Sequence, residues 1–407
     1  MANQAGAVAP GTATGTSLRA PLGGILLLLL LISTQIPSVL AFTIPVPLLA
    51  AIAKDLAHDP ASEYLVKLVA GILGPAMALG APVGGALADR FDRRGLLIGF
   101  GALFALSGFA PMVMDNLEAI VATRVLTGFA AAAMMTTGLA MIGDYLPEEK
   151  RAGTIGTLSA LNMGFSLVIL PVTGFLGDGG WRVPFALYLL GFVGVALAAI
   201  RSLPAPGKRE VGADAAAPPQ ASGMGWLREV PWGLVALGFA VGAMLNILAI
   251  YISYHLASIG EGRMSTISLM MMGNAAIGTL ASALYGRARG RLSTKAIFLI
   301  GFGANGLGMT MLAMAPALWM VAAAMPLTGI AMGWLVPNVL ALAVNSVEEG
   351  QRGKVVGIIH GTMSIAPLIA MTLLEPALPA IGTKGIFLLV AGTATALFGG
   401  FAFSRKL

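Results

Sequence analysis

The sequence predicts an all-α integral membrane protein whose twelve transmembrane helices form two pseudo-symmetric six-helix bundles. Three observations favour this fold class: the composition, a series of long apolar runs, and an internal repeat. Hydrophobic residues make up 57% of the 407-residue chain and charged residues only 10%, and the mean hydropathy is +0.88. A soluble globule of this composition would lack the polar residues needed to cover its surface. The chain is therefore expected in a lipid bilayer.

The apolar runs are long enough to cross about 30 Å of hydrocarbon as helices. The first six expected spans lie near residues 22–53, 62–88, 95–114, 117–143, 152–177 and 183–203. The second six lie near residues 229–258, 264–288, 294–315, 317–345, 353–378 and 384–404. This division predicts a tail at 1–21, an N-terminal domain at 22–203, a flexible linker rich in Pro, Ala and Gly at 204–228, a C-terminal domain at 229–404 and a tail at 405–407.

An internal repeat relates the two sets of spans. Ile98-Gly-Phe-Gly-Ala102 in the third span recurs as Ile300-Gly-Phe-Gly-Ala304 in the ninth. Leu126-Thr-Gly128 in the fourth recurs as Leu327-Thr-Gly329 in the tenth. Both offsets are about 200 residues, which implies two six-helix halves in parallel repeat.

The positions of Lys and Arg predict the orientation in the membrane. Of the 24 basic residues, those expected in loops on one side are only Lys54, Arg182, Arg263 and Lys384. Lys67 and Arg124 fall inside spans, and all the others lie in loops and tails on the second side. Positive loops stay in the cytoplasm, so we expect a multi-pass protein of the cell (inner) membrane with both termini cytoplasmic. Because the basic residues sit in short loops and not on a polar domain, no nucleic-acid partner is expected.

A charged loop follows the second span. It reads Gly85-Ala-Leu-Ala-Asp-Arg-Phe-Asp-Arg-Arg94, and an altered copy, Ser282-Ala-Leu-Tyr-Gly-Arg-Ala-Arg-Gly-Arg291, follows the eighth span. In the copy, Gly286 replaces the acid of Asp89. Any contact that depends on this carboxylate is therefore expected in the N-terminal half alone.

These motifs resemble those of the major facilitator superfamily over nearly the whole chain. The first loop matches the family pattern at Gly85, Leu87, Ala88, Asp89, Arg90, Arg93 and Arg94. Arg124-Val-Leu-Thr-Gly128 and Gly143-Asp-Tyr-Leu-Pro147 are similar to motifs of the twelve-helix drug/proton antiporter branch. In the fifth span, Leu170-Pro-Val-Thr-Gly-Phe175 keeps only Pro171 and Gly174 of the exporter motif. The resemblance implies a transporter that works by alternating access.

The first loop is the predicted cytoplasmic gate. Asp89 lies where an acid can face the positive end of a neighbouring helix, and the resemblance implies that this neighbour begins near Gly353. Asp144 can pair with Arg93 or Arg94, and such pairs would latch the two halves in one state and release them in the other. The alternative is a basic loop that only sets the orientation, with incidental ion pairs.

Arg124 lies about two turns inside the fourth span, where a cation needs a partner or a wet cavity. It is a candidate for holding an anionic substrate or for lowering the pKa of a proton carrier. The alternative is a structural arginine that bonds to backbone carbonyls or extends its guanidinium outward to the membrane surface. Lys67, about one turn inside the second span, is expected to extend its ammonium towards the membrane surface.

The proton carrier is harder to place, because no acid lies at mid-membrane. The first span offers only neutral groups, among them Gln35. The remaining candidates are Glu375, His255, His360 or a carboxylate at a helix end. His360 shares a face of the eleventh span with Ser364, Met371 and Glu375. The alternatives are a polar helix contact for His360 and an interfacial acid for Glu375.

Other polar side chains inside the spans are candidates for the solute site, because burying them without a partner costs free energy. They are Gln35, Asn162, Asn246, Tyr251, Tyr254, Asn274, Trp334 and Asn338. Met-rich runs such as Met270-Met-Met272 suit a pocket that accepts varied apolar shapes, and they also suit ordinary packing.

Together these features predict a secondary active transporter for a small, largely apolar organic solute, with efflux coupled to protons. An importer of an organic acid or other metabolite is the alternative favoured by Arg124, and lipid translocation is a third. A non-transporting sensor is disfavoured by the intact first loop, and an enzyme by the lack of a nucleophile, base and orienting group. We expect a monomer with no cofactor and, with three His and no Cys, no metal site.

Overall fold

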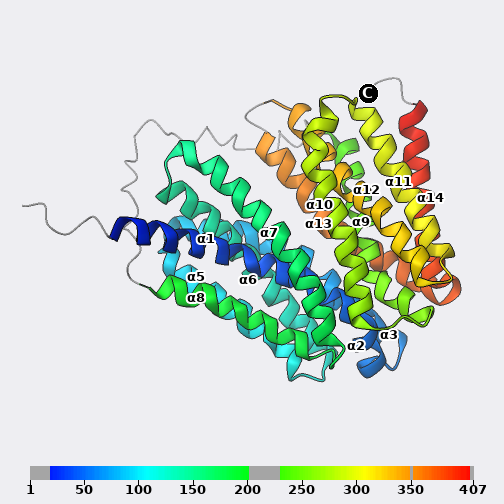
Figure 1. The fold of residues 1–407 in the computed structure, drawn as a ribbon, viewed down its shortest axis with the longest axis horizontal. Coiled ribbons are helices and arrows are strands. Elements are labelled where there is room, and N and C mark those ends of the chain that lie inside the picture. The colour runs from blue at the N-terminus through cyan, green and yellow to red at the C-terminus, as the bar shows by residue number, and fades with distance from the viewer. Residues whose placement is uncertain (1–18, 201–229, 349–351, 404–407) are drawn as a thin grey trace, which may run out of the picture.

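The computed structural model describes residues 19–200, 230–348 and 352–403. The predicted linker, the C-terminal tail and the predicted N-terminal tail up to residue 18 lie outside these ranges. All regular structure in the described part of the chain is helical. Two helical halves, 19–200 and 230–403, lie side by side (Figure 1).

The N-terminal half contains the first six predicted spans. Its elements are α1 (Arg19–Thr43), η1 (Val46–Leu48), α2 (Leu49–Leu56), α3 (Pro60–Gly71), α4 (Leu73–Arg90), α5 (Arg93–Phe109), η2 (Ala110–Met112), α6 (Leu117–Tyr145), α7 (Glu148–Gly177), η3 (Val183–Leu190) and α8 (Gly191–Ala199). Pro45 and Pro47 interrupt the first span with a 3₁₀ turn, since proline lacks the N–H that a continuous helix needs. Side chains cap the helices that follow polar turns: Asp92 accepts from the N–H of Gly95 at the start of α5, at 3.0 Å.

The C-terminal half contains the second six spans. Its elements are α9 (Trp232–Ser258), α10 (Met264–Arg289), α11 (Thr294–Met314), α12 (Leu318–Asn345), α13 (Arg352–Leu374), η6 (Glu375–Ala377) and α14 (Leu378–Phe403). Gly382 has φ of +61° inside α14, a left-handed conformation that favours glycine, and it produces a kink there.

Nine helical units of the described residues are long and apolar enough to cross a membrane, or ten when the bent pair Pro60–Gly71 and Leu73–Arg90 counts as one span. The unit Arg352–Phe403 holds both α13 and α14, and the shorter apolar helix Val183–Ala199 is the predicted sixth span. Twelve spans result.

Equivalent helices pack in the same pairs in both halves. α4 packs on α6 as α10 packs on α12, and α5 packs on α6 and α8 as α11 packs on α12 and α14. Each half encloses its own cluster of buried apolar side chains. The internal repeat is thus a repeat of structure.

The two halves meet through α4 against α13 and α7 against α10. These contacts are close because glycines face them. A Cβ on Gly74 would lie 2.2 Å from the carbonyl oxygen of Ser364, and one on Gly174 would lie 2.4 Å from the hydroxyl of Ser268. Both contacts lie away from the charged Asp89–Arg94 loop, at what we call the opposite face.

The other end, here the basic face, carries the Asp89–Arg94 loop, and the halves separate towards it. Nothing lies within 4 Å of the Cβ positions of Gly85 and Gly156 in the N-terminal half, or of Gly357 and Gly361 in α13. In Figure 1, α7 and α10 approach each other at one end and diverge towards the other. The molecule is closed at the opposite face and open at the basic face.

Candidate functional site

A cavity of about 430 Å³ lies between the two halves. Its wall is mostly apolar and comes from α1, η1, α3, α4 and α7 of the N-terminal half and from α9, α10, α12 and α13 of the C-terminal half. Residues that contribute apolar surface include Phe42, Val46, Leu170, Leu245, Leu248, Ile250, Met271, Met332, Val336 and Met363. A cavity of this size suits a small organic molecule.

Three of the predicted site residues line this cavity: Asn246, Asn274 and His360. The amide of Asn274 is held in place, because its Nδ2 donates to the Thr328 hydroxyl at 2.7 Å. The Asn246 Nδ2 donates to the carbonyl of Gly242 in its own helix at 2.9 Å. Their oxygens, together with the exposed imidazole of His360, can hydrogen-bond a solute, and they carry no fixed negative charge.

Gln35 and Asn162 line a separate cavity of about 270 Å³ within the N-terminal half, between α1 and α7. The buried Oδ1 of Asn162 has no hydrogen-bond partner among the described residues. A third cavity, of about 360 Å³, lies between α7 and the pair α10 and α12. Met163 and Ser166 contribute to it from the N-terminal half, so the surface between the halves continues towards the basic face.

Tyr251, Tyr254 and Glu375 come together at the opposite face around Lys67. The Lys67 ammonium is fully buried and lies 2.5 Å from Oε1 of Glu375. It also lies over the rings of Tyr251 and Tyr254, 5.9 and 5.6 Å from their centroids. The expectation that Lys67 reaches towards the membrane surface is wrong, because it finds a carboxylate and two aromatic faces in the other half.

The predicted face of α13 is turned towards the N-terminal half. His360 and Ser364 line the cavity, Met371 packs against Gly71, and Glu375 reaches Lys67. The sequence contained a signal for the last contact, since Lys67 and Glu375 both lie near the same end of their spans.

Asp178 makes a second contact between the halves at the opposite face. Its carboxylate accepts from the backbone N–H of Ser265 at 3.2 Å and lies 3.8 Å from Arg263. Ser265 is in the first turn of α10, where free N–H groups and the helix dipole favour an anion. Partial burial alone raises the pKa of Asp178, but the hydrogen bonds from Ser265 and the charge of Arg263 outweigh it and hold the pKa below its usual value of 3.8.

Arg124 does not line any of the three cavities. Its Nη2 donates to the carbonyls of Ser107 and Gly108 at 2.7 and 3.0 Å, and its guanidinium lies over the rings of Phe185 and Tyr188. The side chain is fully buried within the N-terminal half. The structure therefore shows the alternative arrangement, an arginine bonded to backbone carbonyls.

Three more predicted site residues lie inside the C-terminal half, away from the cavity. His255 contacts the Thr383 hydroxyl at 3.2 Å and packs on Phe387. The indole N–H of Trp334 donates to the carbonyl of Ala281 at 3.0 Å. Asn338 joins Tyr285 and the carbonyl of Thr294. These contacts connect helices of one half to each other.

The charged loop forms contacts within the N-terminal half. The pairing of Asp144 with Arg93 is confirmed, with Nε 2.9 Å from Oδ2. Because α5 and α6 belong to the same half, this pair does not latch the halves as predicted. Arg94 donates to the carbonyl of Ile200 at 2.6 Å.

The remaining residues of the predicted gate are open to the surroundings. Asp89 and Arg90 are exposed, and the Cβ positions of Gly85 and Gly353 have nothing within 4 Å. The predicted contact of Asp89 with the start of α13 thus remains a prediction for a state in which the basic face is closed.

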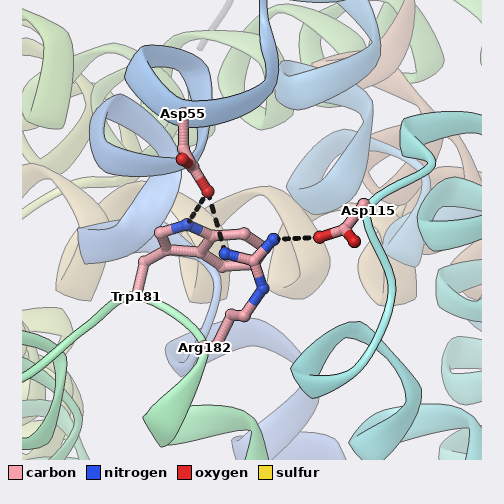
Figure 2. A network of polar contacts seen from close by, with 4 residues as sticks. All are labelled: Asp55, Asp115, Trp181 and Arg182. Carbon is pink, nitrogen blue, oxygen red and sulfur yellow. Dashed lines mark hydrogen bonds and ion pairs between the residues drawn. The ribbon is translucent and has the colours of Figure 1, made fainter.

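A polar network fixes the N-terminal half at the opposite face (Figure 2). Asp55 accepts from the indole of Trp181 at 2.9 Å and from Arg182 at 2.8 Å. Arg182 also donates to Asp115. The network ties α2, the turn before α6 and the segment before η3 together, so this end of the half can move as one body.

Comparisons with known proteins agree with this architecture. The family model described as Major Facilitator Superfamily matches residues 31–263 and again 234–406. The quinolone resistance protein NorA of Staphylococcus aureus is 33% identical over 161 residues, which is 39% of each chain. A putative metabolite transport protein of Bacillus subtilis, YyaJ, is 28% identical over 33% of this chain and 30% of its own. The matched segments thus span well under half the length of these relatives.

Solved transporters share the fold at low identity. The nucleoside transporter NupG has a TM-score of 0.75 at 15% identity, covering 93% of this chain and 100% of its own. The xylose transporter XylE from E. coli, in an inward open conformation, has a TM-score of 0.69 at 14% identity over 94% and 97% of the two chains. With two matches of the family model and two six-helix halves around a shared cavity, the chain belongs to the major facilitator superfamily of membrane transporters.

Proposed function

We propose that the protein exports small, largely apolar organic solutes across the inner membrane in exchange for protons. The observation that carries this proposal is the cavity of about 430 Å³ that both halves line with mainly apolar side chains. A solute that enters it leaves water and gains apolar contact, which is favourable for an apolar molecule. The few polar groups can orient the solute without requiring a charge on it.

The sidedness follows from the charge distribution. With the basic face in the cytoplasm, both termini are cytoplasmic and the cavity opens to the cytoplasm in the described conformation. This is the state in which an exporter collects its solute. A single chain holds both halves of the cavity, so we take the monomer as the working unit.

Alternating access then consists of two rearrangements of the same halves. The contacts of α4 with α13 and of α7 with α10 at the opposite face separate, and the halves close at the basic face. The charged loop lies at that closing end, where Asp89 would face the start of α13. The solute leaves to the outside, and a proton is carried inward in the same cycle.

The resemblance to the quinolone resistance protein supports export. It covers 161 residues, and resistance to a small organic compound is what its removal from the cell would confer. The residue types of the cavity are compatible with such a compound, because its wall offers apolar side chains and neutral hydrogen-bonding groups.

Import of a polar metabolite is the second candidate. Asn246 and Asn274 present amide groups to the cavity, and the solved transporters of the same fold include proteins named for nucleosides and xylose. Amides suit hydroxyl-rich solutes, since they both donate and accept hydrogen bonds. The cavity wall as a whole favours the apolar solute.

Transport by purified protein in liposomes separates the two. We expect a quinolone or an uncharged apolar dye to move from the basic side to the opposite side when that opposite side is acidic. Uptake of xylose or a nucleoside in the reverse direction, with no movement of the apolar probes, would replace export by import. Movement of none of these solutes would remove support for both.

A cavity variant ties the flux to the cavity. Ala275 lines the cavity, and Ala275→Trp should reduce the flux at least ~10-fold, because the indole occupies the volume that the solute needs. Leu106→Trp is the matched control, since Leu106 is 59% exposed on α5 and lines none of the three cavities. Equal flux in both variants would show that the solute takes another path.

A further inference from the structure

The Lys67 ammonium occupies a site that the other half builds for it. Glu375 supplies the negative charge and Tyr251 and Tyr254 supply two ring faces, all from the C-terminal half. Lys67 enters from α3 of the N-terminal half and is fully buried. A buried cation is stable only when a nearby charge compensates it, and ring faces add cation–π attraction. The site therefore holds the halves together at the opposite face.

We propose that Glu375 is the proton-binding residue of this outer gate and that Lys67 is its counter-ion, so that protonation of Glu375 opens the extracellular face. The claim that this gate drives the transport cycle rests on the proposed export function. The gate itself requires only the contacts of the four side chains.

The chemistry of opening is one proton transfer. A proton from extracellular water binds the carboxylate of Glu375 and converts it to a neutral acid. Its Oε2 is buried and has no hydrogen-bond partner among the described residues, so the proton can bind there while Oε1 still faces Lys67. The ammonium is then buried without a compensating charge, and separation of the halves, which lets water reach it, relieves this cost.

Closure reverses these steps. When Lys67 returns to the site, its buried ammonium is stable only beside a carboxylate, so Glu375 releases its proton as the halves close. In the exchange cycle this proton leaves to the water of the cavity between the halves, which then opens towards the basic face. The closed conformation therefore holds the pair in its ionised form. This matches the state in which an antiporter binds its solute and carries no proton.

Other titratable groups surround the pair. Those on the elements packed against it are Glu63 and Tyr64 on α3, Tyr251, Tyr254 and His255 on α9, and Lys384 on α14. Glu63 and Lys384 are exposed, and His255 contacts Thr383. In the described part of the chain, Lys67 is the cation that forms an ion pair with Glu375.

The test measures gate opening without any solute. The chain has no native Cys, so spin labels can be placed at Ala61→Cys on α3 and Ala380→Cys on α14, both exposed. The distance between the labels in liposome-reconstituted protein reports whether the opposite face is open. In the otherwise unchanged chain, we expect the open population to grow as the pH is lowered, because protonation of Glu375 removes the charge that compensates the Lys67 ammonium.

The two single variants are expected to change the pH response of the gate in different ways. Glu375→Gln leaves Lys67 buried beside a neutral group at every pH, so the gate should shift about 100-fold towards open and lose its pH response. Lys67→Met leaves a buried carboxylate without a cation, so acid should now favour the closed gate, the reverse of the unchanged chain. The double variant has neither charge and should be closed and insensitive to pH, which also shows that the neutral interface folds.

Tyr64→Phe is the matched control. It removes the 2.9 Å hydrogen bond between Tyr64 and Thr372 across the same interface without changing a charge, and should keep the pH response. A pH response retained in Glu375→Gln, or one of unchanged sign in Lys67→Met, would overturn the assignment. The gate measurement uses no solute, so the two proposals can fail separately. If the gate responds to pH as predicted but the protein exports no solute, only the export function is rejected. If the protein exports solute but the gate does not respond to pH, only the gate is rejected.

Discussion

At the residue scale, Arg124 shows how an intramembrane charge can serve the fold. Ser107 lies near the end of α5, and the residue four positions later is Pro111. Proline has no N–H, so the carbonyl of Ser107 lacks its helical donor. Arg124 supplies that donor and places a positive charge at the negative end of the helix. Its burial against two aromatic rings has this structural explanation.

We therefore predict that Arg124→Met lowers the free energy of unfolding by about 2–3 kcal/mol, because two carbonyls lose a charged donor in a dry interior. Melting of the purified variant in detergent measures the loss, and the affinity of the folded protein for an exported solute should be unchanged. Loss of solute affinity with an unaltered melting temperature would instead return Arg124 to the solute site.

At the scale of elements, two helix pairs close the opposite face by different means. α4 and α13 touch through backbone at Gly74, and α7 and α10 through Gly174 and the capping carboxylate of Asp178. Close packing of this kind requires small residues, since a side chain would hold the helices apart. Because the pairs come from equivalent places in the two halves, closure depends on both.

Gly74→Val should shift the conformational equilibrium towards an open opposite face, since its Cβ would lie 2.2 Å from the carbonyl oxygen of Ser364. The distance between labels on Ala61→Cys and Ala380→Cys measures the shift. Gly99→Val is the control, because Gly99 on α5 has nothing within 4 Å of its Cβ position. An unchanged distance in Gly74→Val would show that this contact does not limit closure.

Asp178→Asn should weaken closure by about 2- to 5-fold at neutral pH, the usual range for an anion at a helix N-terminus. The lowered pKa of Asp178 means that closure favours the ionised form, so its contribution is complete above the usual value of 3.8 and is lost only as the pH falls through the lowered pKa. The same label pair, followed from pH 7 to pH 3, checks this. If the opening of the unchanged chain at low pH disappears in Asp178→Asn, the proton response belongs to Asp178 and this expectation is contradicted.

At the scale of the whole molecule, the sequence alone predicted the twelve spans and the two halves. Span length and repeated motifs are local properties, and the bilayer restricts spanning segments to helices. The cavity residues Asn246, Asn274 and His360 were also predicted, because polar groups inside spans need a reason to be there. Local pattern does not encode which helix faces meet, so the ion pair of Lys67 with Glu375 was missed.

The same limit explains the errors. Arg124, His255, Trp334 and Asn338 are buried polar groups like the cavity residues, but their partners are carbonyls and side chains of neighbouring helices in the same half. The sequence marks such groups as costly to bury and does not say whether a solute or the fold compensates them. Pro111 was the one local signal that pointed to a structural role for Arg124.

Proton movement during transport tests the central claim most directly. Protein in liposomes with an internal pH dye is given an apolar solute on its basic side, and proton and solute fluxes are followed together. Exchange predicts that solute movement in one direction is accompanied by protons moving in the other, and that Glu375→Gln abolishes the proton flux. Solute and protons moving in the same direction, or solute moving with no proton flux in the unchanged protein, would contradict proton-coupled export.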